Sequence, residues 1–260
     1  MRAVPPERSL AHLPRRGEGG AGQGARPAED FVDDERTEVA VVGAGPLGRE
    51  LVAALGAGRY RVVAVFDDEA LCWTRAVLGV PVRPLSAAEE GPGPCVLAVE
   101  DNRERRRLAE GLEVEWLSLV HPFSWVAPTA SLGPGAIVCA GAVVQPDAVL
   151  GPHAVVGAGA LVGVDARLEA FARLGPGVRL AYGCWLGEGA LVGAGAVLSP
   201  HLRMGAWSVV GEGAVVCADL ADEAVADGRA LAANETPERA PRVENAAPPA
   251  EDAAPPAGEP

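Results

Sequence analysis

The sequence contains no lysine, few aromatic residues and no closely spaced cysteine pair. Without lysine the chain can neither form a Schiff base nor build a P-loop, which needs a lysine for its phosphates. The five cysteines lie far apart and never as CxxC, which argues against a zinc site or a disulfide framework and favours reduced thiols. Aromatic residues make up 4%, whereas 33 Gly and 23 Pro together exceed a fifth of the 260 residues. This composition favours short strands joined by tight turns.

The sequence also lacks positive charge in excess and any long apolar run. Its formal net charge is -13 at pH 7, so we expect neither nucleic acid nor an anionic membrane as a partner. No stretch approaches the ~18 apolar residues that span a bilayer, and residues 1–20 contain no apolar core of a secretory signal. These observations predict a soluble, cytoplasmic protein.

A six-residue repeat runs from Val126 to Ala221. Every sixth residue from Val126 to Val216 is aliphatic, and the residue four places after each is mostly small. Three such strands close one triangular coil, in which the aliphatic side chains point inward and stack from coil to coil, while Gly relieves strain at the corners. The pattern predicts a left-handed parallel β-helix of roughly five coils.

The segment before the repeat alternates between strand-like and helix-like runs. The expected strands and helices, in chain order, are Val39–Val42 (strand), Pro46–Leu55 (helix), Val62–Phe66 (strand), Cys95–Val99 (strand) and Asn102–Gly111 (helix). Strands that alternate with helices predict a small parallel α/β sheet.

Composition divides the chain into four segments. Both ends are rich in Pro, Gly and charged residues and have little to bury, which predicts disorder. The expected boundaries are a disordered arm at 1–36, a Rossmann-like domain at 37–120, a left-handed β-helix domain at 121–235 and a disordered tail at 236–260.

A glycine-rich turn follows the first expected strand. Gly43, Gly45 and Gly48 have the GxGxxG spacing, which lets the backbone approach a phosphate at the N-terminus of a helix. The second strand ends at two carboxylates that can accept hydrogen bonds from ribose hydroxyls. The short domain favours a mononucleotide or nucleotide-sugar over NAD, and the alternative is a turn that only packs helix on strand. The predicted substrate-binding residues are Gly43, Ala44, Gly45, Asp67 and Asp68.

This order of features resembles the sialic acid O-acetyltransferase (NeuD-type) family of hexapeptide-repeat acyltransferases, which includes bacterial sugar N- and O-acyltransferases. The resemblance is carried by VVGAGPLGRELV, VFDD, LGVPV, AVEDNRERRRLAE, LVHP and the hexads. It implies that the first domain binds a nucleotide-sugar and that acetyl-CoA, the donor, lies along the β-helix edge. It also implies an active site between the subunits of a homotrimer.

The sequence departs from this family at its catalytic positions. The family's Glu-His-Asp/Glu stretch, whose His is the general base, corresponds here to Gly163-Val164-Asp165, so Val164 stands at the His position. A second family His falls on Arg173 and an Asn on Gly157. Because a positioned base contributes about 10²–10⁴-fold, two interpretations stay open. Either the base has moved, or the chain is a catalytically degenerate β-helix that binds nucleotide-sugar or scaffolds a pathway.

Three residues are candidates for the catalytic group if the general base has moved: Asp165, Tyr182 and His201. Asp165 keeps the acidic family position, and His201 lies two coils beyond it in the same column, about 10 Å away. Tyr182 lies one coil beyond Val164. The alternative for Tyr182 and His201 is a solvent-facing turn residue. The predicted acyl-CoA contacts are Tyr182, Gly183 and Ala194.

Several other residues are expected to be structural. His153 is predicted to be an exposed corner residue and Cys184 a core residue. Trp207 is predicted to pad a trimer interface, with a pantetheine groove as the alternative. The arginines Arg103, Arg105, Arg106 and Arg107 are predicted to form a solvated helix face, with a phosphate contact as the alternative.

Overall fold

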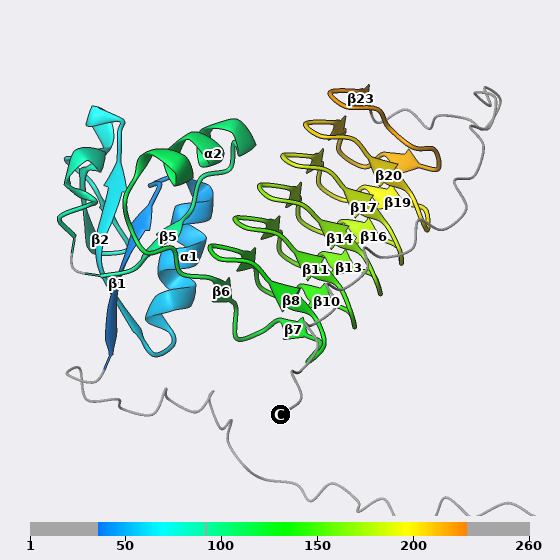
Figure 1. The fold of residues 1–260 in the computed structure, drawn as a ribbon. Coiled ribbons are helices and arrows are strands. Elements are labelled where there is room, and N and C mark those ends of the chain that lie inside the picture. Colours follow the sequence, from blue (N-terminus) through cyan, green and yellow to red (C-terminus); the bar gives the residue numbers. More distant parts are fainter. Residues whose placement is uncertain (1–35, 92, 228–260) are drawn as a thin grey trace, which may run out of the picture.

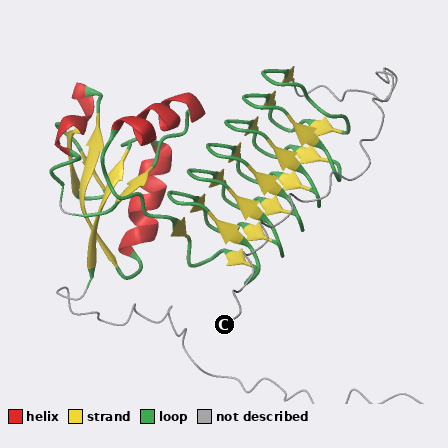
Figure 2. Cartoon of the chain, viewed as in Figure 1, coloured by secondary structure: helices red, strands yellow, loops and turns green. Residues whose placement is uncertain are grey.

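The computed structural model describes residues 36–91 and 93–227 as an α/β unit followed by a parallel β-helix (Figure 1), which confirms the predicted fold class. Figure 2 shows that the helices belong to the first unit and that short strands and loops build the second. Neither helix of the described residues is long and apolar enough to cross a membrane. Residues 1–35 of the predicted arm at 1–36 lie outside the described residues, as do residues 228–235 of the predicted β-helix domain and the predicted tail at 236–260.

The α/β unit is a five-stranded sheet in the order β3-β4-β2-β1-β5. Its elements are β1 (Thr37–Val42), α1 (Pro46–Gly56), β2 (Tyr60–Asp67), η1 (Ala70–Cys72), β3 (Ala76–Val77), β4 (Val80–Pro84), η2 (Leu85–Ala87), β5 (Cys95–Leu97) and α2 (Asn102–Gly111). All neighbouring strands are parallel except β3, which pairs with β4 as a hairpin that the sequence pattern did not predict. Strand β1, which lies between β2 and β5, is buried from Val39 to Val42, as its continuous apolar run predicts.

The β-helix is built from strands of two residues each. They are β6 (Leu119–Val120), β7 (Trp125–Val126), β8 (Ser131–Leu132), β9 (Ile137–Val138), β10 (Val143–Val144), β11 (Val149–Leu150), β12 (Val155–Val156), β13 (Leu161–Val162), β14 (Arg167–Leu168), β15 (Arg173–Leu174), β16 (Arg179–Leu180), β17 (Trp185–Leu186), β18 (Leu191–Val192), β19 (Val197–Leu198), β20 (Arg203–Met204), β21 (Val209–Val210), β22 (Val215–Val216) and β23 (Val225–Ala226).

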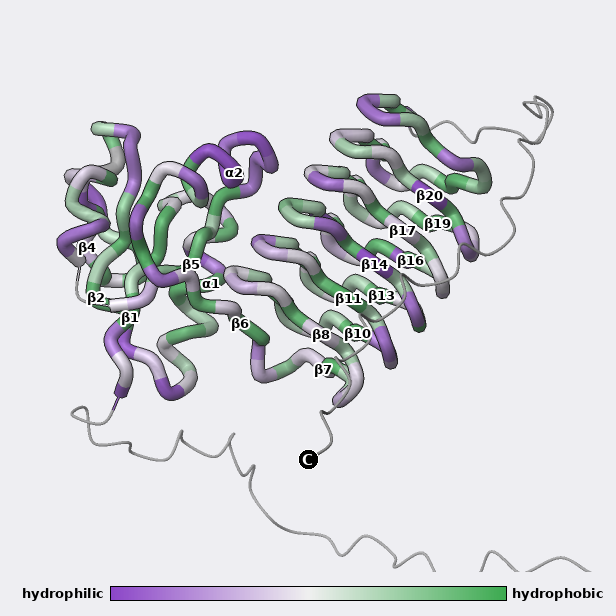
Figure 3. The backbone as a smooth tube through the Cα atoms, viewed as in Figure 1, coloured by the Kyte–Doolittle hydropathy of each residue, from purple (hydrophilic) through white to green (hydrophobic). Residues whose placement is uncertain are grey.

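These strands form three parallel sheets of six, five and seven strands, one on each side of the prism. Each strand pairs with the equivalent strand of the next coil, so that Val144 lies beside Val162 and Leu168 beside Leu186. The second residue of nearly every strand is buried with the small residue of the corner that follows, as the hexads predict. Figure 3 shows hydrophobic residues recurring along the strands of the β-helix, in contrast to the hydrophilic α2. Strands β6 and β23 extend the helix beyond the hexads at both ends, so it exceeds the roughly five predicted coils.

The two units pack through α1 and the seven-stranded sheet. Leu51 and Leu55 of α1 share a core cluster with Ile137 and Val155, which point outward from that sheet. Figure 1 shows α1 lying between the α/β sheet and the β-helix. One face of the prism is therefore covered within the chain.

A second contact between the units corrects the predictions for His153 and Arg105. His153 is only 6% exposed, because its imidazole stacks on Phe171 of the next coil, with 5.3 Å between ring centroids, and meets the edge of Trp116. Burial, and then the charge of Arg105, lower the pKa of His153 to about 4. Arg105 is fully buried and donates hydrogen bonds to the carbonyl oxygens of His153 and Phe171. The helix that carries Arg105 thus docks on a corner of the prism.

Trp207 occupies the same corner two coils beyond Phe171. The guanidinium carbons of Arg103 and Arg106 lie 4.6 and 5.9 Å from the centroid of its ring. Trp207 therefore packs against α2 of its own chain, whereas a trimer interface was predicted.

Candidate active site

The glycine-rich turn brings three backbone segments into close contact. A side chain at Gly43 (φ +111°) would place its Cβ 2.6 Å from the carbonyl oxygen of Ala98, and one at Gly48 would overlap the carbonyl oxygen of Gly43. At Gly45 a Cβ would meet nothing within 4 Å. Gly43 and Gly48 are therefore needed for packing, while Gly45 leaves open space at the start of α1, which has no side-chain cap and no acidic residue in its first turn.

Asp67 fixes this turn to the end of β2. Its carboxylate accepts hydrogen bonds from the amides of Ala44 and Glu69, both at 2.8 Å. Because a carboxylate can accept further bonds, Asp67 keeps the capacity to bind a hydroxyl group. Asp68 is exposed and forms an ion pair with Arg107 of α2 at 3.5 Å.

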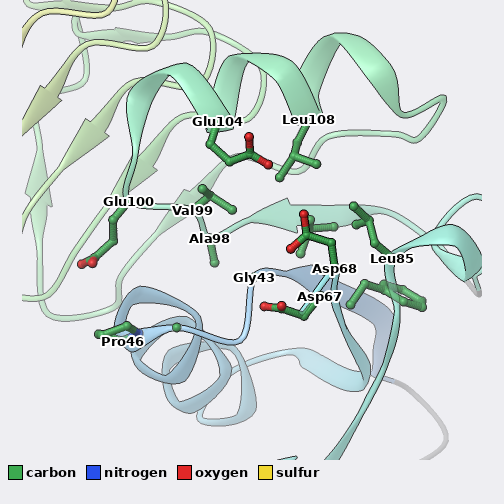
Figure 4. A pocket seen from close by; sticks show the side chains of 13 residues that line it. Gly43, Pro46, Asp67, Asp68, Leu85, Ala98, Val99, Glu100, Glu104 and Leu108 are labelled. Atoms are coloured by element: carbon green, nitrogen blue, oxygen red, sulfur yellow. The ribbon is translucent and has the colours of Figure 1, made fainter. Parts of the chain in front are cut away.

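A cavity of about 210 Å³ lies between the glycine turn, the end of β2 and α2 (Figure 4). It is lined by Gly43, Gly45, Asp67 and Asp68 among the predicted substrate-binding residues, whereas Ala44 contributes its amide to Asp67. The structure therefore brings together residues that lie more than 20 positions apart in the sequence.

The opposite wall of this cavity was missed by sequence analysis. It consists of Ala98, Val99 and Glu100, which follow β5, together with Glu104 and Leu108 of α2. A hydrogen bond from Arg107 lowers the pKa of Glu104, so this carboxyl is charged at neutral pH. A usable signal was present, because the carboxyl ends of parallel strands meet at one edge of a sheet and the third strand is followed by Glu100 and Asp101.

The candidate catalytic residues lie on one edge of the prism, between the six-stranded and five-stranded sheets. Asp165, Gly183 and His201 occupy equivalent corner positions, each with φ near +60°. The His201 ring lies over Gly183 and meets the edge of the Tyr182 ring, with centroids 4.9 Å apart. Tyr182 is 53% exposed and His201 is exposed, so both side chains are open to a ligand.

Val164, which the resemblance predicts to stand at the family's histidine position, lies on this same edge. The carbonyl oxygen of Val164 accepts a hydrogen bond from the amide of Gly183, and the amide of Val164 donates a hydrogen bond to the Gln145 side chain. Asp165 and Gly183 also line a cavity of about 240 Å³ that continues to Arg167, Trp185 and Arg203 of the five-stranded sheet.

The other predicted positions lie elsewhere. Ala194 is on a different edge, between the seven-stranded and six-stranded sheets, so within one chain it does not share a groove with Tyr182. Arg173, which the resemblance predicts to stand at the second family histidine, points outward from β15 and donates hydrogen bonds to Glu100. Cys184 is buried, as predicted. No group of three His, Cys, Asp or Glu side chains in the described residues could hold a metal ion.

The sequence and the structure were compared with known proteins. No family model and no curated protein matches the sequence. Among solved structures, the chain is similar to a histidine-to-asparagine variant of perosamine N-acetyltransferase from Caulobacter crescentus in complex with CoA and GDP-perosamine, with 36% identity and a TM-score of 0.68. That match covers 74% of this chain and 93% of the other.

Two further structures are similar. The acetyltransferase domain of PglB from Neisseria gonorrhoeae, in complex with acetyl coenzyme A, is 32% identical with a TM-score of 0.66, over 73% of this chain and 95% of the other. WeeI from Acinetobacter baumannii, 20% identical with a TM-score of 0.67 over 73% of this chain and 96% of the other, shares the fold.

Proposed function

The chain is an acyltransferase that belongs to the hexapeptide-repeat sugar acetyltransferases, and on that premise we propose that it transfers an acyl group from acetyl-CoA or another acyl-CoA to an amine or hydroxyl of a nucleotide-sugar. The observation that carries the proposal is a match at 36% identity to an enzyme whose structure holds CoA and GDP-perosamine. The match covers 93% of that enzyme and 74% of this chain. Within the superfamily we assign the chain to the sialic acid O-acetyltransferase-like branch, on its ordered linking motifs.

The cavity at the glycine turn is the proposed acceptor site. The uncapped start of α1 offers backbone amides for a phosphate, and Asp67 and Asp68 can accept hydrogen bonds from ribose hydroxyls. The neighbouring carboxylates of Glu100 and Glu104 disfavour a site made only for phosphates, because like charges repel. A ligand with a hydroxyl-rich sugar and few phosphates suits this lining.

An exposed apolar face supports assembly into a homotrimer. The outward side chains of the six-stranded sheet include Trp125, Val197 and Val215, which are 51%, 40% and 48% exposed. The exposed Arg179 interrupts this row between Leu161 and Val197, and the apolar side chains on either side of it favour cover by another copy. In a threefold ring, the Tyr182 edge of one copy can face the Ala194 edge of the next, and the predicted acyl-CoA contacts then line one groove.

His201 is the proposed proton acceptor of the reaction. The acceptor nitrogen or oxygen attacks the thioester carbonyl carbon, the C–S bond breaks, and CoA leaves as a thiolate that takes up a proton. The proton lost by the nucleophile goes to a base, and His201 is an exposed imidazole on the same edge as Val164. The other two described histidines are less suited to this role. His153 is buried, and the Nδ1 of His121 already accepts a hydrogen bond from the amide of Phe123.

Tyr182 and Asp165 complete the proposed catalytic group. Tyr182 holds the His201 ring through their edge-on contact. Asp165 lies two coils away, about 10 Å, which is too far for a direct hydrogen bond to His201 but within the reach of one substrate.

The test is an assay of purified protein with acetyl-CoA and GDP- or UDP-linked amino- and hydroxy-sugars, in which free CoA and the acylated sugar are measured. We expect turnover, and we expect His201→Asn to lower kcat by about 10²-fold or more. Asp147→Asn is the matched control, because Asp147 has the same corner conformation (φ 61°) at the same edge. Equal kcat values for the two variants would remove His201 from the mechanism.

The second candidate function is a catalytically degenerate β-helix that binds nucleotide-sugar or scaffolds a pathway. Val164 at the family histidine position favours it. Nucleotide-sugar binding measured by calorimetry, without CoA release from any acceptor, would establish this function instead.

A further inference from the structure

Two arginines from different parts of the chain converge on one wall of the acceptor cavity. Nη1 of Arg105 donates to the carbonyl oxygens of Val99 at 2.9 Å and Glu100 at 3.3 Å. Arg173, on strand β15 of the β-helix, donates to the same Glu100 carbonyl at 2.9 Å and to its carboxylate at 3.2 Å. Val99 and Glu100 are both lining residues of the cavity (Figure 4).

Arg105 also binds the β-helix directly, so it joins the wall to the prism. Its Nε donates to the carbonyl oxygen of His153 at 3.1 Å and its Nη2 to that of Phe171 at 2.7 Å. The remaining partner is the side-chain oxygen of Asn102 at 2.8 Å, and the Asn102 amide in turn donates to the carbonyl oxygen of Gly189. A fully buried cation whose hydrogen-bond partners are all uncharged is costly to desolvate. This cost indicates that Arg105 has a role other than packing the two units together.

The wall is held from its other side by the glycine turn. The carbonyl oxygen of Ala98 lies against Gly43, so tightly that a Cβ at Gly43 would approach it to 2.6 Å. The segment from Ala98 to Glu100 is thus clamped between the glycine turn and the two arginines. Its position is set jointly by the α/β unit and the β-helix.

We propose that Arg105 and Arg173 are positioning residues that hold the Val99–Glu100 wall against the β-helix, so that a nucleotide-sugar in the cavity is presented to the acyl donor in a fixed orientation. This inference rests on the proposed function. It also gives Arg173, at the position of the second family histidine, a task in placing the acceptor.

The test compares Arg173→Met with Arg106→Met in the full chain. Arg173→Met keeps the aliphatic stem and removes both bonds to Glu100. Arg106 also joins α2 to the β-helix, through an ion pair with Glu188 and the face of Trp207, but its hydrogen bonds and ion pairs within the described residues go to Glu110 and Glu188 and not to Val99 or Glu100. It is therefore matched for docking and lacks the proposed positioning role.

We expect Arg173→Met to raise the KM for nucleotide-sugar about tenfold, the loss that follows from removing a charge-assisted hydrogen bond. The KM for acetyl-CoA should stay within about twofold. Arg173→Lys should restore part of the acceptor affinity, because its ammonium group can still donate to Glu100 although it lacks the planar fork of the guanidinium group. Arg106→Met should leave both KM values near those of the unchanged protein. Thermal unfolding of each variant checks that the fold is kept.

A rise in both KM values, or equal behaviour of Arg173→Met and Arg106→Met, would overturn the positioning role. No CoA release by the unchanged protein would instead contradict the proposed function. In that case direct titration of the two variants with GDP- and UDP-sugars still decides the inference, since unequal affinity supports it and equal affinity refutes it.

Discussion

Acidification should destabilise this protein through one buried histidine. The Nδ1 of His153 has no hydrogen-bond partner among the residues that the structure describes, and burial lowers the pKa of His153 from 6.5 to about 4. Between these pH values the unfolded chain binds a proton at His153 that the folded chain does not. The contribution of neutral His153 to the unfolding free energy is therefore fully present above about pH 6.5, and it is lost progressively as the pH falls to about 4. The pKa difference corresponds to about 3 kcal/mol of unfolding free energy.

The groups that face the imidazole of His153 support a lowered pKa. Trp116 and Phe171 are neutral rings, and the charged neighbour is Arg105, which opposes a second positive charge. The measurement is urea unfolding followed by circular dichroism at a fixed protein concentration, from about pH 7 to pH 4.

His153→Phe is the matched variant, because Phe171 occupies the equivalent corner with φ +60° against +54° at His153. The difference in unfolding free energy between the two proteins isolates the histidine from the titration of carboxylates. We expect His153→Phe to lose about 3 kcal/mol less over this pH range. Parallel pH profiles for the two proteins would refute the assignment of a buried, neutral imidazole.

Three further predictions concern the core, the glycine turn and the uncovered face. Leu174→Ala, in the fully buried column of the β-helix, should lower the unfolding free energy by about 2–5 kcal/mol in urea titrations. Gly48→Ala should abolish nucleotide-sugar binding in calorimetry, because its Cβ would overlap the Gly43 carbonyl oxygen, whereas Gly56→Ala, with no atom within 4 Å, should bind normally. Val197→Asp should shift sedimentation from a trimer to a smaller species, since it places a charge on the apolar outer face; an unchanged mass would argue against that face as the interface.

The regular parts of the fold could be predicted from sequence because each depends on neighbours at short, fixed separations. In the β-helix every strand pairs with the strand one coil away, so the six-residue frame specifies both the inward column and the register. The α2 bounds were predicted without error for the same local reason: Asp101 caps the amide of Glu104, and Gly111 ends the helix. The glycine turn was equally visible in the spacing of Gly43 and Gly48.

The candidate site was predicted only in part. The residues after β1 and β2 were recognised, whereas the wall from Ala98 to Glu104 was missed, because its role depends on β5 pairing with β1 and on α2 folding back over the sheet. On the β-helix edge, the hexads placed Asp165 and His201 in one column, which the structure reproduces. The contact of His201 with Tyr182 depends on side-chain conformations that the repeat does not specify.

By itself the sequence determined a parallel β-helix and an α/β unit with a glycine-rich turn. Only the tertiary structure decided which corner residues are buried. A hexad corner faces solvent unless another element covers it, and α2 covers the corner of His153, Phe171 and Trp207. Arg105 therefore lies in the interior although its immediate neighbours in the sequence are exposed or half-exposed. Its burial follows from contacts 48 and 66 residues away, which no local pattern encodes.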